Sequence, residues 1–161
     1  MKQARVLFVC LGNICRSPTA HGVFANMVAQ RGLTEVIEVD SCGTGGWHVG
    51  EPPDARASAE AHKRGYDLSP LRARQIHSTD FQRFDYILAM DQMNLADLRD
   101  LCPASYAGRL DLFLSFAGDV AEIEVPDPYY GGDRGFAHVL DLVELASAGL
   151  LAEISSARSA G

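Results

Sequence analysis

The sequence lacks the features that mark membrane and secreted proteins. No apolar run is longer than Val6 to Leu11, which is far too short to span a bilayer, and no small-residue cleavage site follows it. We therefore expect no signal peptide, no membrane association and a cytoplasmic location. Cysteine is also scarce: four residues in a chain of 161 do not suggest a disulfide scaffold.

Positive charge is in deficit as well. The chain has 14 Lys and Arg against 21 Asp and Glu, a net charge of -7. Because the phosphate backbone of a nucleic acid repels a protein of negative net charge, we expect no nucleic-acid partner. The content of 47% hydrophobic and 22% charged residues is typical of a globular protein. No repeat, low-complexity tract or linker divides the chain, so we predict a single domain over residues 1–161.

Short apolar runs alternate with helical patterns along the whole chain. The expected strands are residues 5–10, 36–39, 84–90 and 110–116, and a helical pattern follows each of them. This order predicts an α/β fold: a single doubly wound domain, a four-stranded parallel sheet with helices on both faces. Ligands in such folds bind beyond the carboxyl ends of the strands, where Cys10 is expected.

Helix boundaries follow from capping residues. Ser17 and Pro18 predict an N-cap followed by proline in the first turn, Asp54 predicts a second cap, and Asn94 predicts the start of a short helix. The last helix has an apolar stripe at helical spacing: Phe136, Val139, Leu140, Val143, Ala146 and Leu150.

The segment from residue 10 to residue 17 reads Cys-Leu-Gly-Asn-Ile-Cys-Arg-Ser. Between a strand and a helix, such a loop can turn its N–H groups inward around an anion, and Gly12 and Asn13 tolerate the positive φ that a tight wrap needs. Arg16 can clamp the anion with two hydrogen bonds, and the same donors favour the thiolate of Cys10 at the bottom of the cradle. No carboxylate occurs before Glu35, in agreement with an anion site.

Cys10 also has two other interpretations, as a structural core residue and as a zinc ligand. A cysteine at the end of a strand is often a small core residue. A zinc site from Cys10, Cys15 and His21 is disfavoured because no fourth ligand is near and Arg16 would oppose the cation. We therefore expect no metal in this loop, and no metal or organic cofactor elsewhere, because a thiolate, an arginine and an aspartate complete the chemistry.

Three segments together resemble the low-molecular-weight protein tyrosine phosphatases. Residues 9–18 resemble that family's phosphate loop, residues 43–54 its second signature, and residues 127–131 its third. The resemblance implies that Cys10 is the nucleophile of a cysteinyl-phosphate intermediate and that Arg16 binds the phosphoryl oxygens. It also implies that Asp127 protonates the leaving phenol and then activates water.

The resemblance assigns further residues. Asn13 would hold the loop in a strained form and Ser17 would donate a hydrogen bond to the thiolate. The phosphate-binding loop would comprise Leu11, Gly12, Asn13, Ile14, Cys15 and Ser17, and the substrate cleft would be walled by Trp47, Tyr129 and Tyr130. The substrate would be a phosphotyrosine protein, for which a tyrosine kinase is one candidate. The oligomeric state, monomer or weak dimer, is left open.

The chemistry of Asp127 is also reasonable without the family. A phenolate leaves more easily when an acid supplies its proton, which contributes about 10²–10⁴-fold. Pro126 and Pro128 restrict the backbone on either side, although Pro-Asp-Pro in isolation also predicts a simple turn. One departure from the family is Leu71, where many relatives carry a histidine that supports the loop asparagine. We expect Cys42, where relatives often have alanine, to be a core residue.

Three competing functions stay open. An arsenate reductase on this scaffold needs a relay of further thiols, and no cysteine lies between Cys42 and Cys102. A protein arginine phosphatase resembles this family closely but has threonine where this chain has Ile14, so a phenyl ring is favoured. The third is a catalytically silent anion-binding or redox-sensing module, since Cys10 and Cys15 share one short loop and a disulfide between them is plausible. Phosphorylation of Tyr129 or Tyr130 is a further hypothesis.

Overall fold

The computed structural model describes residues 3–128 and 133–160. Its strands are β1 (Ala4–Cys10), β2 (Ile37–Gly43), β3 (Tyr86–Ala89) and β4 (Arg109–Leu112), and its helices are α1 (Arg16–Gln30), α2 (Ala55–Lys63), α3 (Asp80–Arg83), α4 (Gln92–Leu101) and α5 (Asp133–Ala160). The strands form one parallel sheet in the order β2-β1-β3-β4. The predicted four-stranded α/β fold is confirmed.

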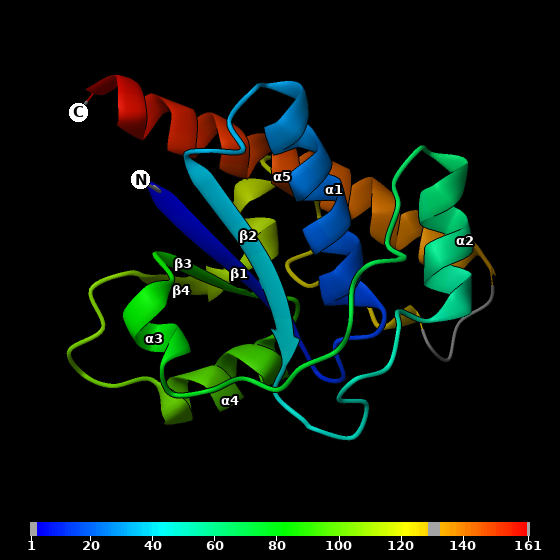
Figure 1. Cartoon of the computed structure of the whole chain (residues 1–161), viewed down its shortest axis with the longest axis horizontal. Coiled ribbons are helices and arrows are strands. Elements are labelled where there is room, and N and C mark those ends of the chain that lie inside the picture. The colour runs from blue at the N-terminus through cyan, green and yellow to red at the C-terminus, as the bar shows by residue number, and fades with distance from the viewer. Residues whose placement is uncertain (1–2, 129–132, 161) are drawn as a thin grey trace.

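Helices cover both faces of the sheet (Figure 1). Because β1 is an inner strand, its side chains are buried on both sides. Phe8 packs with Phe24 of α1 and with apolar residues of α5 on one face, whereas Leu7 packs with Leu98 of α4 on the other. This arrangement fixes the carboxyl end of β1, and with it Cys10, between two helical layers.

Helix α5 carries the predicted apolar stripe, whose residues are all buried. The segment Arg134–Ala157 is also long and apolar enough to cross a membrane, with a hydropathy of 1.4, although half of its most apolar window is buried inside the protein. Val139, Val143 and Leu150 belong to the hydrophobic core, which accounts for that apolar character. Asp141, Glu144 and Glu153 interrupt its apolar residues in the sequence, so that the helix contains no long uninterrupted apolar run.

Several predicted boundaries are wrong. The fourth strand ends at Leu112 rather than at residue 116, because the chain turns into a 3₁₀ helix, η1 (Phe113–Phe116), that brings Phe113 and Phe116 onto one side and buries both. The second strand runs on to Gly43 rather than ending at residue 39. A short helix, α3, was not predicted.

The capping predictions have mixed outcomes. Asp54 caps α2, its carboxylate accepting from the N–H groups of Arg56 and Ala57. Ser17 is not the N-cap of α1: the helix begins at Arg16, and the Ser17 side chain points to Cys10 instead. Asn94 does not open α4 either, because Asp91 is the cap and accepts a hydrogen bond from the Asn94 N–H.

Candidate active site

The loop between β1 and α1 curls around the sulfur of Cys10. The main-chain N–H of Asn13 donates to Cys10 Sγ at 3.3 Å, and Ser17 Oγ lies 3.0 Å from the same sulfur. Cys10 is only 3% exposed. It lies in a cavity of about 220 Å³, here named the phosphate pocket, whose lining residues are Cys10, Leu11, Gly12, Ile14, Cys15, Arg16, Trp47, His48 and Asp127.

Asn13 holds the loop in its curled form. Its φ of 59° is in the left-handed region, as the sequence predicted. Its side-chain amide donates to Ser17 Oγ at 2.7 Å, so the single Ser17 proton is left for Cys10 Sγ or for the Cys42 carbonyl 3.3 Å away. When the sulfur is a thiolate, the Ser17 hydroxyl is placed to donate to it.

Gly12 serves a different purpose from the one predicted. It has no positive φ; a Cβ at this position would lie 2.9 Å from Cδ2 of His48. A larger residue at this position would therefore displace the His48 ring, which packs on the loop and whose Nδ1 lies 2.6 Å from the Glu51 carboxylate.

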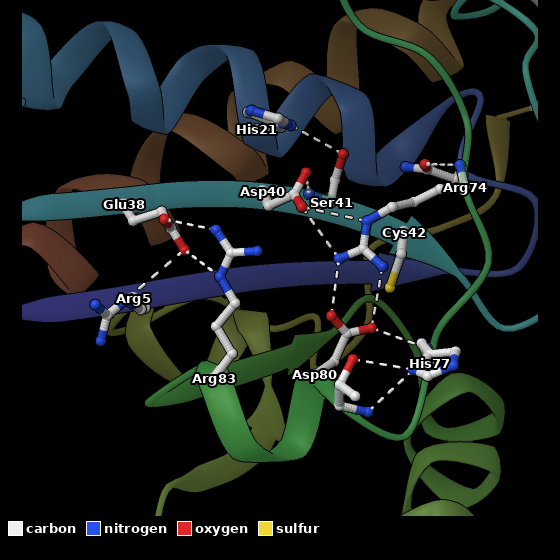
Figure 2. A network of polar contacts seen from close by, with 12 residues as sticks. Arg5, His21, Glu38, Asp40, Ser41, Cys42, Arg74, His77, Asp80 and Arg83 are labelled. Atoms are coloured by element: carbon white, nitrogen blue, oxygen red, sulfur yellow. Dashed lines mark hydrogen bonds and ion pairs between the residues drawn. The ribbon is translucent and has the colours of Figure 1, made fainter. Parts of the chain in front are cut away.

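The support for Asn13 that the sequence left unassigned comes from Arg74. The Arg74 main-chain N–H donates to Asn13 Oδ1 at 3.0 Å. Its guanidinium bonds Asp40 at 3.1 and 3.2 Å and Asp80 at 3.0 and 3.1 Å (Figure 2). Burial opposes the charge of Arg74, but the hydrogen bond to Asp80 and the nearby negative charges raise its pKa. Asn13 is thus held from the segment that follows Leu71, by a main-chain group that needs no particular side chain.

Arg16 is buried beside Cys10, with a side chain only 5% exposed. Its Nη1 donates to Asp91 Oδ2 at 2.7 Å and to the Val125 carbonyl at 3.0 Å. Burial alone would lower the pKa of Arg16, but the charges of Cys10 and Asp91 raise it. With Nη1 fixed from behind, the guanidinium keeps a defined orientation at the wall of the phosphate pocket.

Asp91 is a site residue that the sequence reasoning missed. One of its oxygens caps α4 and the other holds Arg16. The available signal was its position: Asp91 follows directly after the expected third strand, whose carboxyl end lies beside that of β1. Recognising that sheet edge would have placed a carboxylate next to Arg16.

Asp127 reaches the phosphate pocket from the other side. Its carboxylate is 41% exposed and lies 3.9 Å from Arg16 Nη2. The preceding Val125 is fully buried, donates its N–H to the Met90 carbonyl, and accepts from Arg16. Asp127 is therefore held at the mouth of the pocket within reach of both a bound ligand and solvent.

Of the predicted cleft residues, Trp47 lines the phosphate pocket and is 72% exposed. Tyr129 and Tyr130 lie outside the described residues.

Cys15 and Ile14 also line the pocket. Burial together with the charge of Asp54 raises the pKa of Cys15 to about 12, so its thiol is neutral at physiological pH. Cys42 is fully buried in the core, as expected.

Within residues 3–128 and 133–160, no group of three His, Cys, Asp or Glu side chains is arranged to hold a metal ion. His21, which the zinc alternative invoked, lies with Nδ1 2.9 Å from Ser41 Oγ (Figure 2).

Comparison with known proteins agrees with this geometry. The model of the family "Low molecular weight phosphotyrosine protein phosphatase" matches residues 5–160. A low molecular weight protein-tyrosine-phosphatase of Streptomyces coelicolor is 47% identical over 153 residues, which are 93% of each chain. A crystal structure of a protein tyrosine phosphatase from Entamoeba histolytica, with Hepes in its active site, has a TM-score of 0.91 at 40% identity and covers 96% of this chain and 99% of that one. The Drosophila arginine phosphatase DARP has a TM-score of 0.86 at 33% identity, covering 95% and 97%.

Proposed function

The chain belongs to the low molecular weight phosphotyrosine protein phosphatase family, a family of hydrolases, and on that premise we propose how its own residues perform the reaction. One observation carries the proposal: a buried thiol, a buried guanidinium and a half-exposed carboxylate, those of Cys10, Arg16 and Asp127, line one pocket. The substrates are phosphoproteins, and we propose phosphotyrosine as the group removed.

In the first step, the phosphoryl group of the substrate binds in the phosphate pocket against Arg16 and the loop. The Cys10 thiolate attacks phosphorus, so that an S–P bond forms as the P–O bond to the phenol breaks. Asp127 gives its proton to the departing phenol oxygen, which leaves as tyrosine. Because Arg16 is already oriented by Asp91, its charge stabilises the transition state without reorganisation.

In the second step, Asp127 is a carboxylate and takes a proton from a water molecule. That water attacks phosphorus, the S–P bond breaks, and inorganic phosphate and the Cys10 thiolate are released. The Ser17 hydroxyl, 3.0 Å from Cys10 Sγ, favours the thiolate as leaving group. Water is the only co-reactant, and no oxidant or reductant is required.

The residues of the phosphate pocket favour tyrosine over the alternatives. Ile14 presents a branched apolar side chain where a planar cation would need a polar partner, which supports phosphotyrosine against phosphoarginine. Only Cys10 and Cys15 among the four cysteines line the pocket, so a third thiol for an arsenate-reducing relay is not at hand. The tyrosine kinase partner, the cytoplasmic location and the monomeric or weakly dimeric state stay predictions.

The test is hydrolysis of para-nitrophenyl phosphate in the presence of EDTA. We expect turnover by the wild type, none by Cys10→Ser, and a loss of about 10²–10⁴-fold in kcat for Asp127→Ala. Cys102→Ser is the matched thiol control, since Cys102 lies outside the phosphate pocket, and Asp119→Ala is the matched exposed carboxylate. Absence of turnover by the reduced wild type would overturn the proposal. Comparing phosphotyrosine with phosphoarginine peptides then tests the substrate class.

A further inference from the structure

A second cavity adjoins the phosphate pocket and shares two of its residues. This flanking groove, of about 330 Å³, is lined by Leu11, Thr44, Gly45, Trp47, Asp97, Asp100 and Leu101. Its walls come from the segment after β2 and from α4, which lie close together at the carboxyl end of the sheet (Figure 1). Since Leu11 and Trp47 line both cavities, the flanking groove lies directly beside the phosphate pocket.

The apolar part of the flanking groove is unusually exposed. Trp47 is 72% exposed, Leu101 55% and Leu11 40%. A Cβ at Gly45 would collide with the six-membered ring of Trp47, so only glycine lets the indole lie across this loop between the two cavities. One face of the indole is therefore available to a side chain next to the phosphotyrosine.

Three polar side chains of the groove lack partners among the described residues, 3–128 and 133–160. The carboxylates of Asp97 and Asp100 form no hydrogen bond and no ion pair there, and the buried hydroxyl of Thr44 has no hydrogen-bond partner. Asp91, at the start of the same helix, is by contrast bonded to Arg16.

The fold gives no reason for this pair of carboxylates. They are like charges three residues apart on one side of α4, an arrangement that destabilises a helix. Asp100 also lies in the last turn, where the helix dipole favours a cation. Two charges that the helix would be more stable without, beside an exposed tryptophan and an active-site pocket, indicate a ligand of opposite charge.

We propose that the flanking groove binds a lysine or arginine side chain of the substrate, close in sequence to the phosphotyrosine. The apolar stem of that side chain lies along Leu101 and Trp47, and its charged head meets Asp97 and Asp100 and the face of the indole. The proposal rests on the proposed function, because it names the sequence context that the same site prefers.

The experiment compares two phosphotyrosine peptides that differ only in the flanking residues, arginine in one and glutamine in the other. We expect the wild type to have a kcat/KM about three- to tenfold higher for the arginine peptide at low salt, and less at high salt. In Asp97→Asn/Asp100→Asn the two peptides become equivalent. Because neither carboxylate lines the phosphate pocket, hydrolysis of para-nitrophenyl phosphate is unchanged in this variant, and its melting temperature is equal or higher.

The matched control is Glu35→Gln/Asp119→Asn, which removes the same charge from exposed positions outside both cavities. This control should retain the preference for the arginine peptide. Retention would show that the preference depends on the carboxylates of the groove and not on the net charge of the protein. Equal rates for the two peptides in the wild type, or a preference for the arginine peptide that survives Asp97→Asn/Asp100→Asn, would overturn the proposal. Absence of turnover of para-nitrophenyl phosphate would instead overturn the proposed function, so the two failures are distinguishable.

Discussion

The main-chain N–H of Arg74 lies 3.0 Å from the side-chain oxygen of Asn13, and this hydrogen bond connects the loop around Cys10 to an ion-pair cluster outside the phosphate pocket. The guanidinium of Arg74 is fixed by Asp40 on β2 and Asp80 on α3. Gly43 donates its N–H to the Arg74 carbonyl at 2.8 Å, which attaches the same segment to the end of β2. The position of Asn13 therefore depends on groups that never touch a substrate.

Among the carboxylates of this cluster, Asp80 is the one whose replacement should reduce stability and activity most. Its carboxylate is buried and accepts two hydrogen bonds from Arg74 and one from the N–H of His77. We expect Asp80→Asn to lower the free energy of unfolding by about 1.5–3 kcal/mol. Because the Arg74 segment that holds Asn13 becomes less firmly fixed while Arg16 still binds phosphate, kcat for para-nitrophenyl phosphate should fall several-fold with little change in KM. Urea unfolding and steady-state kinetics measure the two effects.

Glu38→Gln is the matched control for Asp80→Asn. Glu38 also pairs with an arginine across the edge of β2, but Arg83 is 58% exposed (Figure 2). Removing an exposed pair costs about 0–1 kcal/mol, and no contact joins it to Asn13. Equal losses of kcat in the two variants would show that the Arg74 cluster has no special connection to the phosphate pocket.

Asn13 supplies side-chain hydrogen bonds and also adopts a left-handed backbone conformation, and two substitutions can separate these roles. Both Asn13→Ala and Asn13→Gly remove the hydrogen bonds to Ser17 and Arg74, so both should lower kcat. Alanine is also strained at a φ of 59°, whereas glycine is not. We expect Asn13→Ala to be less stable than Asn13→Gly by about 1 kcal/mol in thermal unfolding. A reversed order would mean that the backbone at this residue relaxes.

The sequence predicted the sheet because its signals are local: apolar runs and caps alternate in an order that few folds accommodate. It placed Cys10 and Arg16 correctly because both belong to one short loop whose ends are fixed by a strand and a helix. The same local logic was wrong about Ser17, whose hydroxyl is a good N-cap in isolation but is directed to Cys10 here.

The long-range contacts could not be predicted in this way. Asp91 and Arg74 reach the loop only after strands distant in sequence become neighbours, so nothing within a few residues of either one shows its role. The flanking groove was missed for the same reason. Its residues come from three separate segments, and the exposure of Trp47 cannot be inferred from composition.

His21 should make the fold sensitive to acid. Burial lowers its pKa below 6.5, Asp40 opposes this, and Arg74 adds to it. As pH falls below about 6.5, the unfolded chain takes up a proton at His21 before the folded one does, so stability that is complete above that pH is progressively lost. We expect the urea midpoint to fall between about pH 7.5 and pH 5.5. The fall should be smaller in His21→Gln but not in the control His62→Gln, which replaces an exposed histidine.

Asp91 offers a test of the orientation of Arg16. Asp91→Asn keeps a good N-cap for α4, since asparagine caps as well as aspartate, but removes the charge that holds Arg16 Nη1 at 2.7 Å. We expect thermal stability to change little and kcat/KM for para-nitrophenyl phosphate to fall about tenfold, the loss of one charge-assisted hydrogen bond. A marked fall in melting temperature with an unchanged kcat/KM would show that Asp91 stabilises α4 and does not orient Arg16.

Cys15 and Cys10 line the same pocket, and we expect Cys15 to protect Cys10 from irreversible oxidation. Hydrogen peroxide oxidises the Cys10 thiolate to a sulfenic acid and is itself reduced to hydroxide. The Cys15 thiol then displaces one water from that sulfenic acid to form a disulfide, which a thiol reductant reverses. Because burial raises the pKa of Cys15 to about 12, only a small fraction is thiolate at neutral pH. The disulfide should therefore form slowly near pH 7 and about tenfold faster for each pH unit above it.

After mild treatment with peroxide, the wild type should regain activity when a reductant is added. The Cys15→Ser variant should lose its activity irreversibly, because its Cys10 reaches higher oxidation states, and Cys102→Ser should behave as wild type. Full recovery of Cys15→Ser, measured by activity and by the mass of the loop peptide, would exclude this role.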